Sequence, residues 1–424
     1  MEKERTYFVI DMKTFFASVE CAERGLDPFQ TNLVVADSGR GEGTVCLAIT
    51  PKMKEMGIRN RCRLFEIPKS VKFIMASPRM KKYIEYAAEI YAIYLKYISS
   101  SDIHVYSIDE CFIDATDYLK LYNLTAKEFA LKLMNEIKEK LHIPSSCGIG
   151  TNLYLAKIAL DITAKKSEDK IGFLNEEEFK KTLWEYRPLT DFWGISYGIA
   201  ERLEKYCIYD MKGIATSDED FLYDEFGVNA ELLIDHAKGR ETCLISDIKN
   251  YKSKSKSISS SQILPCNYNY KDAKIVMMEM VQNGCYDLMK QGYVTQHLRL
   301  IIGYGDNKQK REKTKGTIRM KETTNLNTII VKYFSKLYDE IVDKTRPIRQ
   351  ISYGFDNLLS ADHEYYDLFT DINKIKKEKN LTKEVIHLQE RYGKNSVLKG
   401  TDLQEKATQR DRNKMIGGHR SGEN

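Results

Sequence analysis

The segment VYSIDECFID, residues 105–114, places two adjacent acids between two apolar halves with strand character. We expect the two halves to pair as a β-hairpin that carries Asp109 and Glu110. A second apolar run, FVID, ends in Asp11 near the start of the chain. If these strands are neighbours in one sheet, the three acids meet at one place. Each acid alone has an ordinary strand-end or turn alternative, but unpaired charges inside apolar strands are costly and favour a shared functional role.

Three carboxylates in one place suit one kind of chemistry. Transfer of a nucleotide to a 3′ oxygen needs carboxylates that hold two Mg²⁺ ions about 4 Å apart. One ion activates the attacking oxygen, and the other binds the triphosphate and the leaving group. The chain offers hard oxygen ligands, whereas its nine cysteines form no C-x-x-C pair and its histidines form no zinc-type cluster. The sequence therefore favours magnesium over zinc.

The composition is that of a globular protein with several domains. A chain of 424 residues, 42% hydrophobic and 30% charged, exceeds one compact core. The net charge of +5 is too small to indicate nucleic-acid binding by itself, so local clusters of basic residues must carry that argument. No apolar stretch approaches a membrane span, and the charged N-terminus has no leader-like apolar core. With its scattered cysteines, this pattern indicates a cytoplasmic protein without a membrane segment.

The order of the expected elements divides the chain into parts. Up to about residue 182, strands alternate with helices, and the hairpin favours a mixed α+β sheet. From residue 183 the strand signal fades, and glycine-containing turns separate helical patterns. Residues 249–261 contain four lysines, six serines and no acid, which is typical of a flexible basic linker. Beyond this linker we expect strand, helix, strand, basic loop, strand, helix and strand, followed by a polar helical tail.

These motifs also resemble a known family. FVID followed by FFASVE at residues 15–20 resembles the first motif of Y-family translesion DNA polymerases, and YSIDECFID resembles their S-I-D-E motif. The match extends over roughly residues 5–357. Within the family, the chain is most similar to UmuC/DinB-like proteins, specifically the UvrX-type UV-damage repair polymerases of Gram-positive bacteria, phages and plasmids. LFEIP at residues 64–68 and RNKMIGGH at residues 412–419 support this branch.

The resemblance implies an α+β multidomain fold in the form of a right hand. Such a hand has a mixed-sheet palm, small fingers, a helical thumb with a helix-hairpin-helix, and an α/β little finger. We place the palm at residues 1–30 and 78–182, the fingers at 31–77, the thumb at 183–248, a basic linker at 249–260, the little finger at 261–357 and a C-terminal tail at 358–424.

The same resemblance implies a template-directed DNA polymerase that performs error-prone translesion synthesis in DNA damage tolerance, mutagenesis and the SOS response. Asp11, Asp109 and Glu110 are its expected catalytic residues and metal ligands, and the Met12 carbonyl is a further expected ligand; Asp114 is expected to be structural. The expected cofactor is a pair of Mg²⁺ ions, for which Mn²⁺ can substitute. The expected partners of a monomeric enzyme are primer-template DNA, damaged DNA and deoxynucleoside triphosphates.

Four residues are expected to bind the nucleotide. Phe16 occupies the family's steric-gate position, where a flat ring leaves no room for a ribose 2′ hydroxyl, and Phe15 is either its stacked neighbour or a core aromatic. Lys54 stands where many relatives have Arg, and it offers the triphosphate a point charge instead of a bidentate fork. Lys165 matches the family's phosphate-binding lysine, although the spacing is one residue longer than in some relatives and leaves Lys166 as an alternative.

Three further segments are expected to contact macromolecules. GISYGI at residues 194–199 resembles a helix-hairpin-helix, in which Gly194, Ile195 and Gly198 let backbone N–H groups approach a DNA phosphate. The basic stretch 308–321 is expected to bind phosphates rather than to be only a solvated loop, with Lys308, Lys310, Arg311, Lys313 and Lys315 as candidates. Leu368 and Phe369 resemble a sliding-clamp peptide that lacks its leading Gln, with an amphipathic helix face as the alternative.

Two rival functions are open on sequence grounds. A nucleotide cyclase on a similar palm usually carries a Gly-Gly-x-Glu-Phe hairpin, which SIDE at residues 107–110 is not, and it lacks a helix-hairpin-helix. A non-catalytic lesion- or DNA-binding protein with an inactive palm would not need all three acids. Primer extension on a synthetic template with Mg²⁺ separates these functions.

Overall fold

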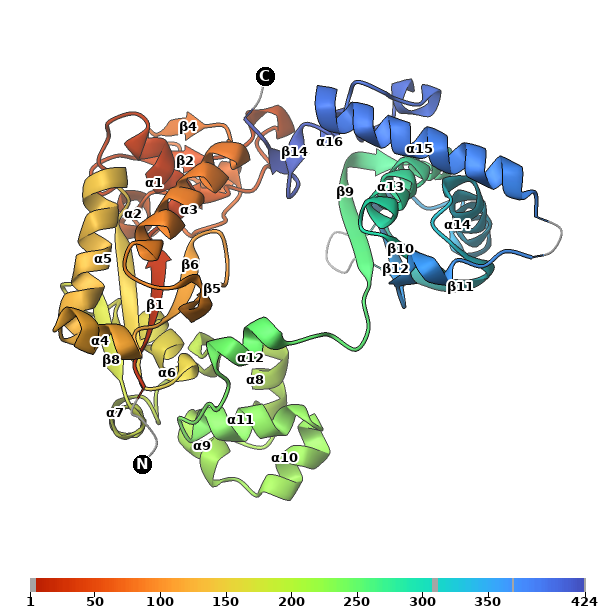
Figure 1. The fold of residues 1–424 in the computed structure, drawn as a ribbon. Helices are drawn as coiled ribbons and strands as arrows, with labels where there is room; N and C mark the ends of the chain where they lie inside the picture. Colours follow the sequence, from red (N-terminus) through yellow and green to blue (C-terminus); the bar gives the residue numbers. More distant parts are fainter. Residues whose placement is uncertain (1–4, 307–311, 368–369, 423–424) are drawn as a thin grey trace. The chain divides into compact units, whose positions relative to one another are not determined.

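The computed structural model describes residues 5–306, 312–367 and 370–422 (Figure 1). The chain forms two compact units, which we describe separately. The first unit comprises Met1–Tyr251 and His419–Asn424, and the second comprises Lys252–Gly418. Both units combine helices with sheets, which confirms the predicted α+β class. No helix in the described ranges is long and apolar enough to cross a membrane.

A five-stranded mixed sheet forms the centre of the first unit. Its strand order is β5 (Ile103–Val105), β6 (Glu110–Asp114), β1 (Tyr7–Met12), β7 (Ser145–Gly150) and β8 (Ile171–Leu174). β1 lies between β6 and β7 and is antiparallel to both, whereas β7 and β8 are parallel. The helices beside this sheet are α1 (Phe15–Ala22), α3 (Met80–Leu95), α4 (Thr116–Tyr122), α5 (Ala126–Leu141) and α6 (Leu153–Ile158).

The two faces of this sheet have different cores, because side chains of a strand alternate between its faces. Phe8 and Ile10 on β1 are fully buried in the core that includes residues of α1, α3 and α5. Tyr7 and Val9 pack on the opposite face with residues of α6 and of the π-helical turn Ala159–Thr163. The same alternation assigns Asp11 to the α6 face.

A small three-stranded sheet forms a subregion of the first unit. Its order is β3 (Ala48–Ile49), β2 (Leu33–Val35) and β4 (Ile74–Ala76). α2 (Pro51–Glu55) follows β3 directly and has Pro51 in its first turn, where a missing N–H costs no helical hydrogen bond. Ile49 and Met53 are fully buried in a separate core, so the element that carries Lys54 is well packed.

The next part of the first unit is helical, as the fading strand signal predicts. It contains α7 (Glu176–Thr182), α8 (Tyr197–Glu204), α9 (Met211–Thr216), α10 (Glu219–Phe226), α11 (Asn229–Ala237) and α12 (Ile245–Asn250). Phe192, Leu203 and Leu222 share one core with Tyr154 and Leu155 of α6. The helices therefore pack directly against the element that covers one face of the main sheet.

The second unit is built around a five-stranded antiparallel sheet, in which β11, β10, β12 and β9 follow one another and the short β13 (Leu359–Ser360) pairs with β10. Its elements follow the chain as β9 (Ile258–Tyr268), α13 (Tyr270–Lys290), β10 (Tyr293–Tyr304), β11 (Lys313–Thr324), α14 (Asn327–Ile341) and β12 (Ile348–Asp356). Leu298, Leu300 and Ile302 of β10 are buried against the two helices. This is the predicted order of strands and helices.

Two boundaries differ from the sequence-based expectation. The basic stretch was predicted as a loop, but from Lys313 onward it is strand β11, because small and apolar residues alternate with its basic residues; residues 307–311 lie outside the described ranges. The linker predicted at 249–260 is also shorter, because α12 continues to Asn250 and β9 begins at Ile258.

The C-terminal region returns twice to earlier parts of the chain. It contains β13 (Leu359–Ser360), α15 (Ile372–Tyr392), α16 (Gln409–Arg412), β14 (Met415–Ile416) and β15 (His419–Arg420). Within the second unit, the Thr408 N–H donates to the buried Glu279 carboxylate at 3.0 Å. Within the first unit, Arg420 pairs with Asp37 at 2.8 Å, and the Lys81 N–H donates to the Ser421 carbonyl at 3.0 Å. Each unit thus includes a piece of the C-terminal region.

Candidate active site

Three acids lie at one end of β1 and β6, and we call Asp11, Asp109 and Glu110 the acidic triad. Asp11 and Glu110 are direct partners in the antiparallel register, so their side chains share one face of the sheet. Asp109 immediately precedes β6, and its carbonyl accepts a hydrogen bond from the Met12 N–H at 2.9 Å. β5 and β6 form the predicted hairpin. Strand pairing therefore brings together acids that are far apart in sequence.

The acidic triad carries more negative charge than its surroundings offset. Burial, followed by the charges of Asp109 and Glu110, raises the pKa of Asp11 to about 7 from its ordinary value of 3.8. Burial also raises the pKa of Glu110, although the nearby Lys157 ammonium opposes the change. Such repulsion among partly buried acids is relieved by a bound cation, which makes the site suited to a metal ion.

Neighbouring side chains contact two of the carboxylates. The three carboxylates are not arranged around one position that a metal ion could occupy. The Ser107 hydroxyl donates to Asp109 Oδ1 at 2.6 Å, and Lys157 Nζ lies 2.8 Å from Glu110 Oε1. Across the described ranges, no three His, Cys, Asp or Glu side chains are arranged to hold a metal ion as they stand. The donor chemistry nevertheless fits Mg²⁺, because all three side chains offer hard carboxylate oxygens and their charges repel one another. Met12 is buried, which is compatible only with a role for its backbone.

Lysines from separate elements lie close enough to the acidic triad to interact with it electrostatically. Partial burial and the charge of Lys165 lower the pKa of Lys54, and the Asp11 carboxylate opposes this change. Lys54 therefore lies within electrostatic range of both Asp11 and Lys165. Lys166 differs from Lys165, because its Nζ lies over the Tyr186 ring at 5.0 Å from the centroid. Lys13, which the sequence analysis did not consider, belongs to the same group: burial, Lys170 and Lys54 lower its pKa.

The two predicted aromatic residues have different environments. Phe15 is only 2% exposed and is part of the main core. Phe16 is partly exposed, and its ring centroid lies 4.7 Å from that of Tyr83 and 5.7 Å from that of Phe15. The Tyr83 hydroxyl donates to the buried Glu20 at 2.8 Å and so fixes the surface on which Phe16 rests. Of the two rings, Phe16 has the surface to offer a ligand.

α6 supplies a residue that sequence reasoning missed. All six of its residues are buried, including Lys157, which is 6% exposed. A Cβ on Gly148 would lie 2.0 Å from the Ala156 carbonyl, and one on Gly150 would lie 2.2 Å from the Ala156 N–H nitrogen, so only glycine lets α6 approach β7 this closely. A lysine inside an otherwise apolar helical run is the signal that could have indicated this position.

The segment between Lys157 and Lys165 contains a π-helical turn. The Ala164 N–H donates to the Ala159 carbonyl at 2.8 Å, five residues earlier, and residues 159–163 form a π-helical turn. A π-turn holds one more residue than an α-turn, and such turns are frequent at functional sites.

The basic residues of the second unit gather on one face of β11. Lys313, Lys315 and Arg319 lie opposite Gly303, Ile301 and His297 of β10, whereas the alternate residue Ile318 packs toward the helices. Lys313, Lys315, Arg319 and Lys321 are all exposed. The strand therefore presents a row of cations to solvent. Lys308, Lys310 and Arg311 lie outside the described residues.

The predicted helix-hairpin-helix residues lie at the start of α8. Gly194 has a φ of 91°, a conformation that favours glycine, and Ile195 is buried in the helical core. Ser196 caps the helix by accepting the Ile199 N–H at 3.4 Å, and Gly198 lies in the first turn. The N–H groups of this turn are thus presented on a tight, well-supported connection.

The segment before the predicted clamp-binding pair is paired with the second sheet. Tyr365 exchanges two backbone hydrogen bonds with Thr323 of β11, at 3.0 and 2.9 Å. The Tyr366 hydroxyl lies 2.7 Å from the Thr324 hydroxyl. Leu368 and Phe369 lie outside the described residues, so the clamp prediction stays a prediction.

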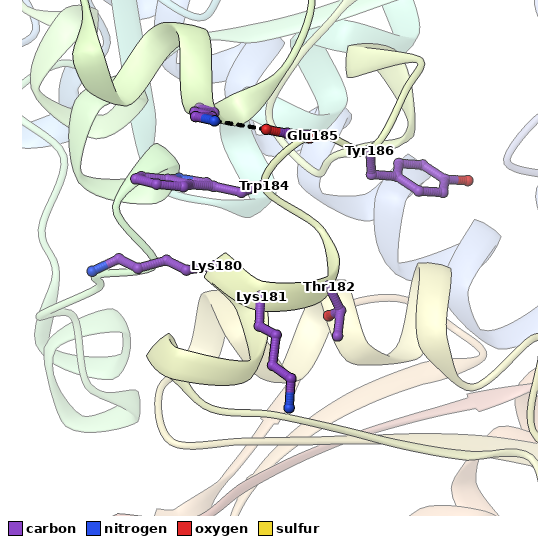
Figure 2. Close-up of a pocket in the computed structure, with 7 residues that line it drawn as sticks. Lys180, Lys181, Thr182, Trp184, Glu185 and Tyr186 are labelled. Atoms are coloured by element: carbon purple, nitrogen blue, oxygen red, sulfur yellow. Dashed lines mark hydrogen bonds and ion pairs between the residues drawn. The ribbon is translucent and has the colours of Figure 1, made fainter.

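A hollow of about 460 Å³ lies elsewhere on the first unit, between the end of α7 and α9 (Figure 2). Its walls include Lys180, Lys181, Trp184, Tyr186 and Lys212. Glu185 pairs with Lys212 at 2.7 Å, and Glu176 pairs with Lys180 at 2.6 Å. None of the predicted site residues lines this hollow, and acids offset two of its lysines, so the acidic triad remains the candidate site.

Comparison with known proteins agrees with this arrangement. The impB/mucB/samB family matches residues 10–161, and the impB/mucB/samB family C-terminal domain matches residues 255–368, together more than half of the chain. The UV-damage repair protein UvrX of Bacillus subtilis (strain 168) is 27% identical over 423 residues, which are 97% of this chain and 97% of that protein. DNA polymerase IV 2 of the same organism is 29% identical over 431 residues, covering 99% of this chain and 100% of that protein.

A solved structure shares the fold. A Y-family DNA polymerase chimera has a TM-score of 0.66 at 21% sequence identity, and the alignment covers 84% of this chain and 99% of the chimera. The two family matches, the full-length relatives and the shared fold all lead to one assignment. The chain belongs to the impB/mucB/samB family and is a UmuC/DinB-like Y-family DNA polymerase.

Proposed function

We propose that the protein copies damaged DNA templates by nucleotidyl transfer at the acidic triad, with two divalent metal ions. The observation that carries this proposal is the meeting of Asp11 and Glu110 as register partners on one face of the sheet, with Asp109 beside them. Lys54 lies close enough to Asp11 and to Lys165 to interact with both electrostatically. Carboxylates beside unpaired cations are the arrangement that phosphoryl transfer from a nucleoside triphosphate requires.

Each group in the site has a distinct proposed task. Asp11, Asp109, Glu110 and the Met12 carbonyl would hold two Mg²⁺ ions, or Mn²⁺ in their place. When bound, the ions stabilise the charge that develops on the transferred phosphate and activate the primer 3′ oxygen. Lys54 and Lys165 bind the triphosphate as point charges. The partly exposed ring of Phe16, supported by Tyr83, excludes the ribose 2′ hydroxyl and selects deoxynucleotides.

The proposal assigns the parts of a right hand to the observed subregions. The main sheet is the palm, the small sheet with α2 is the fingers, the helical part is the thumb, and the sheet of the second unit is the little finger. The cationic face of β11 and the start of α8 bind the phosphates of primer-template DNA without reading its sequence. The proposal further includes error-prone translesion synthesis by a monomer in the cytoplasm during the SOS response, and weak binding to a sliding clamp.

Primer extension tests this function. The purified full-length protein is given a synthetic primer-template, one deoxynucleotide at a time and Mg²⁺, on an intact template and on one with a UV photoproduct. We expect incorporation of the complementary nucleotide, extension across the lesion, and loss of both in Asp11→Asn. Asp114→Asn is the matched control, because Asp114 is on the same strand pair but binds Arg5 and Thr116. A wild-type protein that binds the duplex without extending it would instead be the non-catalytic alternative.

A further inference from the structure

One cation is already present on the acidic triad. Lys157 Nζ lies 2.8 Å from Glu110 Oε1 and 3.2 Å from the carboxylate of Asp161. Lys157 is 6% exposed, and Glu110 is 8% exposed, so water contributes little to the solvation of either charge. Within the described ranges, this is the one ion pair that any member of the acidic triad makes. Asp161 is more open to solvent, with 29% of its side chain exposed.

Lys157 lies close to the main sheet because glycines on β7 allow α6 to approach it. Asp11 and Glu110 share the face that α6 covers, and Gly148 and Gly150 allow α6 to contact β7 without intervening side chains. Asp161 follows one turn after Lys157, inside the π-helical turn 159–163. Lys157 therefore lies between two acids, of which one belongs to the proposed metal site and the other does not.

Lys157 has opposite electrostatic effects in the ion-free and ion-bound states of the site. Without an ion, the buried carboxylate of Glu110 needs a positive partner, because removing one member of a buried pair leaves a costly unpaired charge. When a divalent ion binds Glu110, however, the nearby ammonium repels that ion. The second acceptor, Asp161, lets the ammonium keep a partner after Glu110 turns to the ion. Without Asp161, ion binding would leave the buried Lys157 ammonium without an acidic partner.

We propose that Lys157 is a positioning residue that holds Glu110 in the ion-free enzyme and moves to Asp161 when divalent ions bind. This inference rests on the proposed metal-dependent function. It makes Lys157 a resident cation that competes with metal ions for Glu110, and it makes Asp161 the group that weakens this competition. The two residues therefore have opposite effects on metal affinity, which a merely structural ion pair would not have.

Thermal unfolding of the full-length protein, with EDTA or with increasing Mg²⁺, separates these effects. A ligand that binds the folded state raises its stability according to its concentration and affinity. We expect Lys157→Met to unfold at a lower temperature in EDTA but to gain more from Mg²⁺ than the wild type, with several-fold tighter apparent binding. We expect Asp161→Asn to gain less, with several-fold weaker apparent binding. Lys157→Arg should behave like the wild type.

Controls make each outcome decisive. Lys96→Met removes an exposed lysine that pairs with Glu136, so its loss of stability should be the same with and without Mg²⁺. If Lys157→Met does not fold, Lys157→Arg and Asp161→Asn still test the exchange. Equal shifts with and without Mg²⁺ in the Lys157 and Asp161 variants, or shifts of metal affinity in the same direction, would overturn the inference. If Mg²⁺ does not stabilise the wild type at all, the proposed metal site itself fails.

Discussion

The acidic triad and the cationic face of β11 support their charges in different ways. The acids lie beneath α6, where burial and mutual repulsion raise the pKa of Asp11 to about 7 and where Lys157 pairs with Glu110. The lysines of β11 stand exposed on the edge strand of their sheet. A buried charge is sensitive to the geometry and identity of each neighbour, whereas exposed charges act additively and are screened by salt. We therefore expect chemistry at the acidic triad and salt-dependent binding at the cationic face of β11.

The largest difference between the regions should appear when the acids are changed. We expect Asp109→Asn and Glu110→Gln to lower the rate of nucleotide incorporation by at least about 100-fold, because charge stabilisation in the transition state is lost. Fluorescence anisotropy should show nearly unchanged affinity for a primer-template. Substantial extension by either variant would remove these residues from the catalytic site.

The next effect concerns the shape of the buried site. We expect Phe16→Ala to raise the use of ribonucleotides relative to deoxyribonucleotides by roughly tenfold or more, because a hydrophobic surface that excludes one hydroxyl is lost. Single-nucleotide incorporation kinetics with paired ribo- and deoxyribonucleotides measures this ratio. Phe15→Leu is the control, since Phe15 lies in the core and should affect stability more than sugar selection. Unchanged discrimination in Phe16→Ala would make Phe16 a packing residue.

Substitutions on the cationic face of β11 should change only the affinity for primer-template DNA. We expect the triple variant Lys313→Gln, Lys315→Gln, Arg319→Gln to bind primer-template DNA more weakly and to reduce the slope of log affinity against log salt by about 2 to 3, since each phosphate contact contributes about 0.9. At saturating DNA, its incorporation rate should equal that of the wild type. An unchanged salt slope would show that another surface binds the phosphates.

The pH dependence of stability offers a finer comparison. Because the folded-state pKa of Asp11 is about 7 and its ordinary value is 3.8, the folded protein binds this proton more tightly than the unfolded chain does. In EDTA, Asp11 should therefore destabilise the fold increasingly as pH rises from about 4 to 7, with no further change above that. Thermal unfolding should find Asp11→Asn more stable than the wild type at pH 8 and similar to it at pH 4. Lys315→Gln should show no such trend.

The smallest expected effect lies outside both regions. We expect Leu368→Ala with Phe369→Ala to leave extension of a bare primer unchanged and to remove only the stimulation by a sliding clamp, because two apolar side chains would carry most of the binding of such a peptide. Extension with and without the clamp, at low enzyme concentration, measures this. Stimulation that survives the double substitution would place the contact elsewhere.

The parts of the fold that depend on local signals were predictable from the sequence. Such signals set the bounds of α5, Ala126–Leu141, because Thr125 and Glu128 form a reciprocal cap and His142 adopts a left-handed conformation that ends the helix. The acidic triad followed from two apolar strand motifs. β11 was mistaken for a loop because its high charge obscured the alternation of exposed basic and inward-facing small or apolar residues.

The features of the site that the sequence analysis did not predict depend on packing between segments that are distant in sequence. Lys157 becomes a partner of Glu110 only when glycines on β7 admit α6, and no local pattern specifies that contact. The π-helical turn before Lys165 and Lys166 likewise has no distinct sequence signal. Lys13 was overlooked because its neighbours, Lys54 and Lys170, come from other elements.

The attachment of residues 419–422 to the first unit has a practical consequence. The chain leaves that unit after Tyr251 and rejoins it at His419, so the second unit is an insertion between two segments of the first. A shortened chain that ends at residue 418 would keep every strand of both main sheets but would leave the 7% exposed Asp37 without Arg420. Residues 421 and 422 lie beside the start of α3, where the Lys81 N–H donates to the Ser421 carbonyl. Removal of residues 419–422 is therefore a change to the first unit.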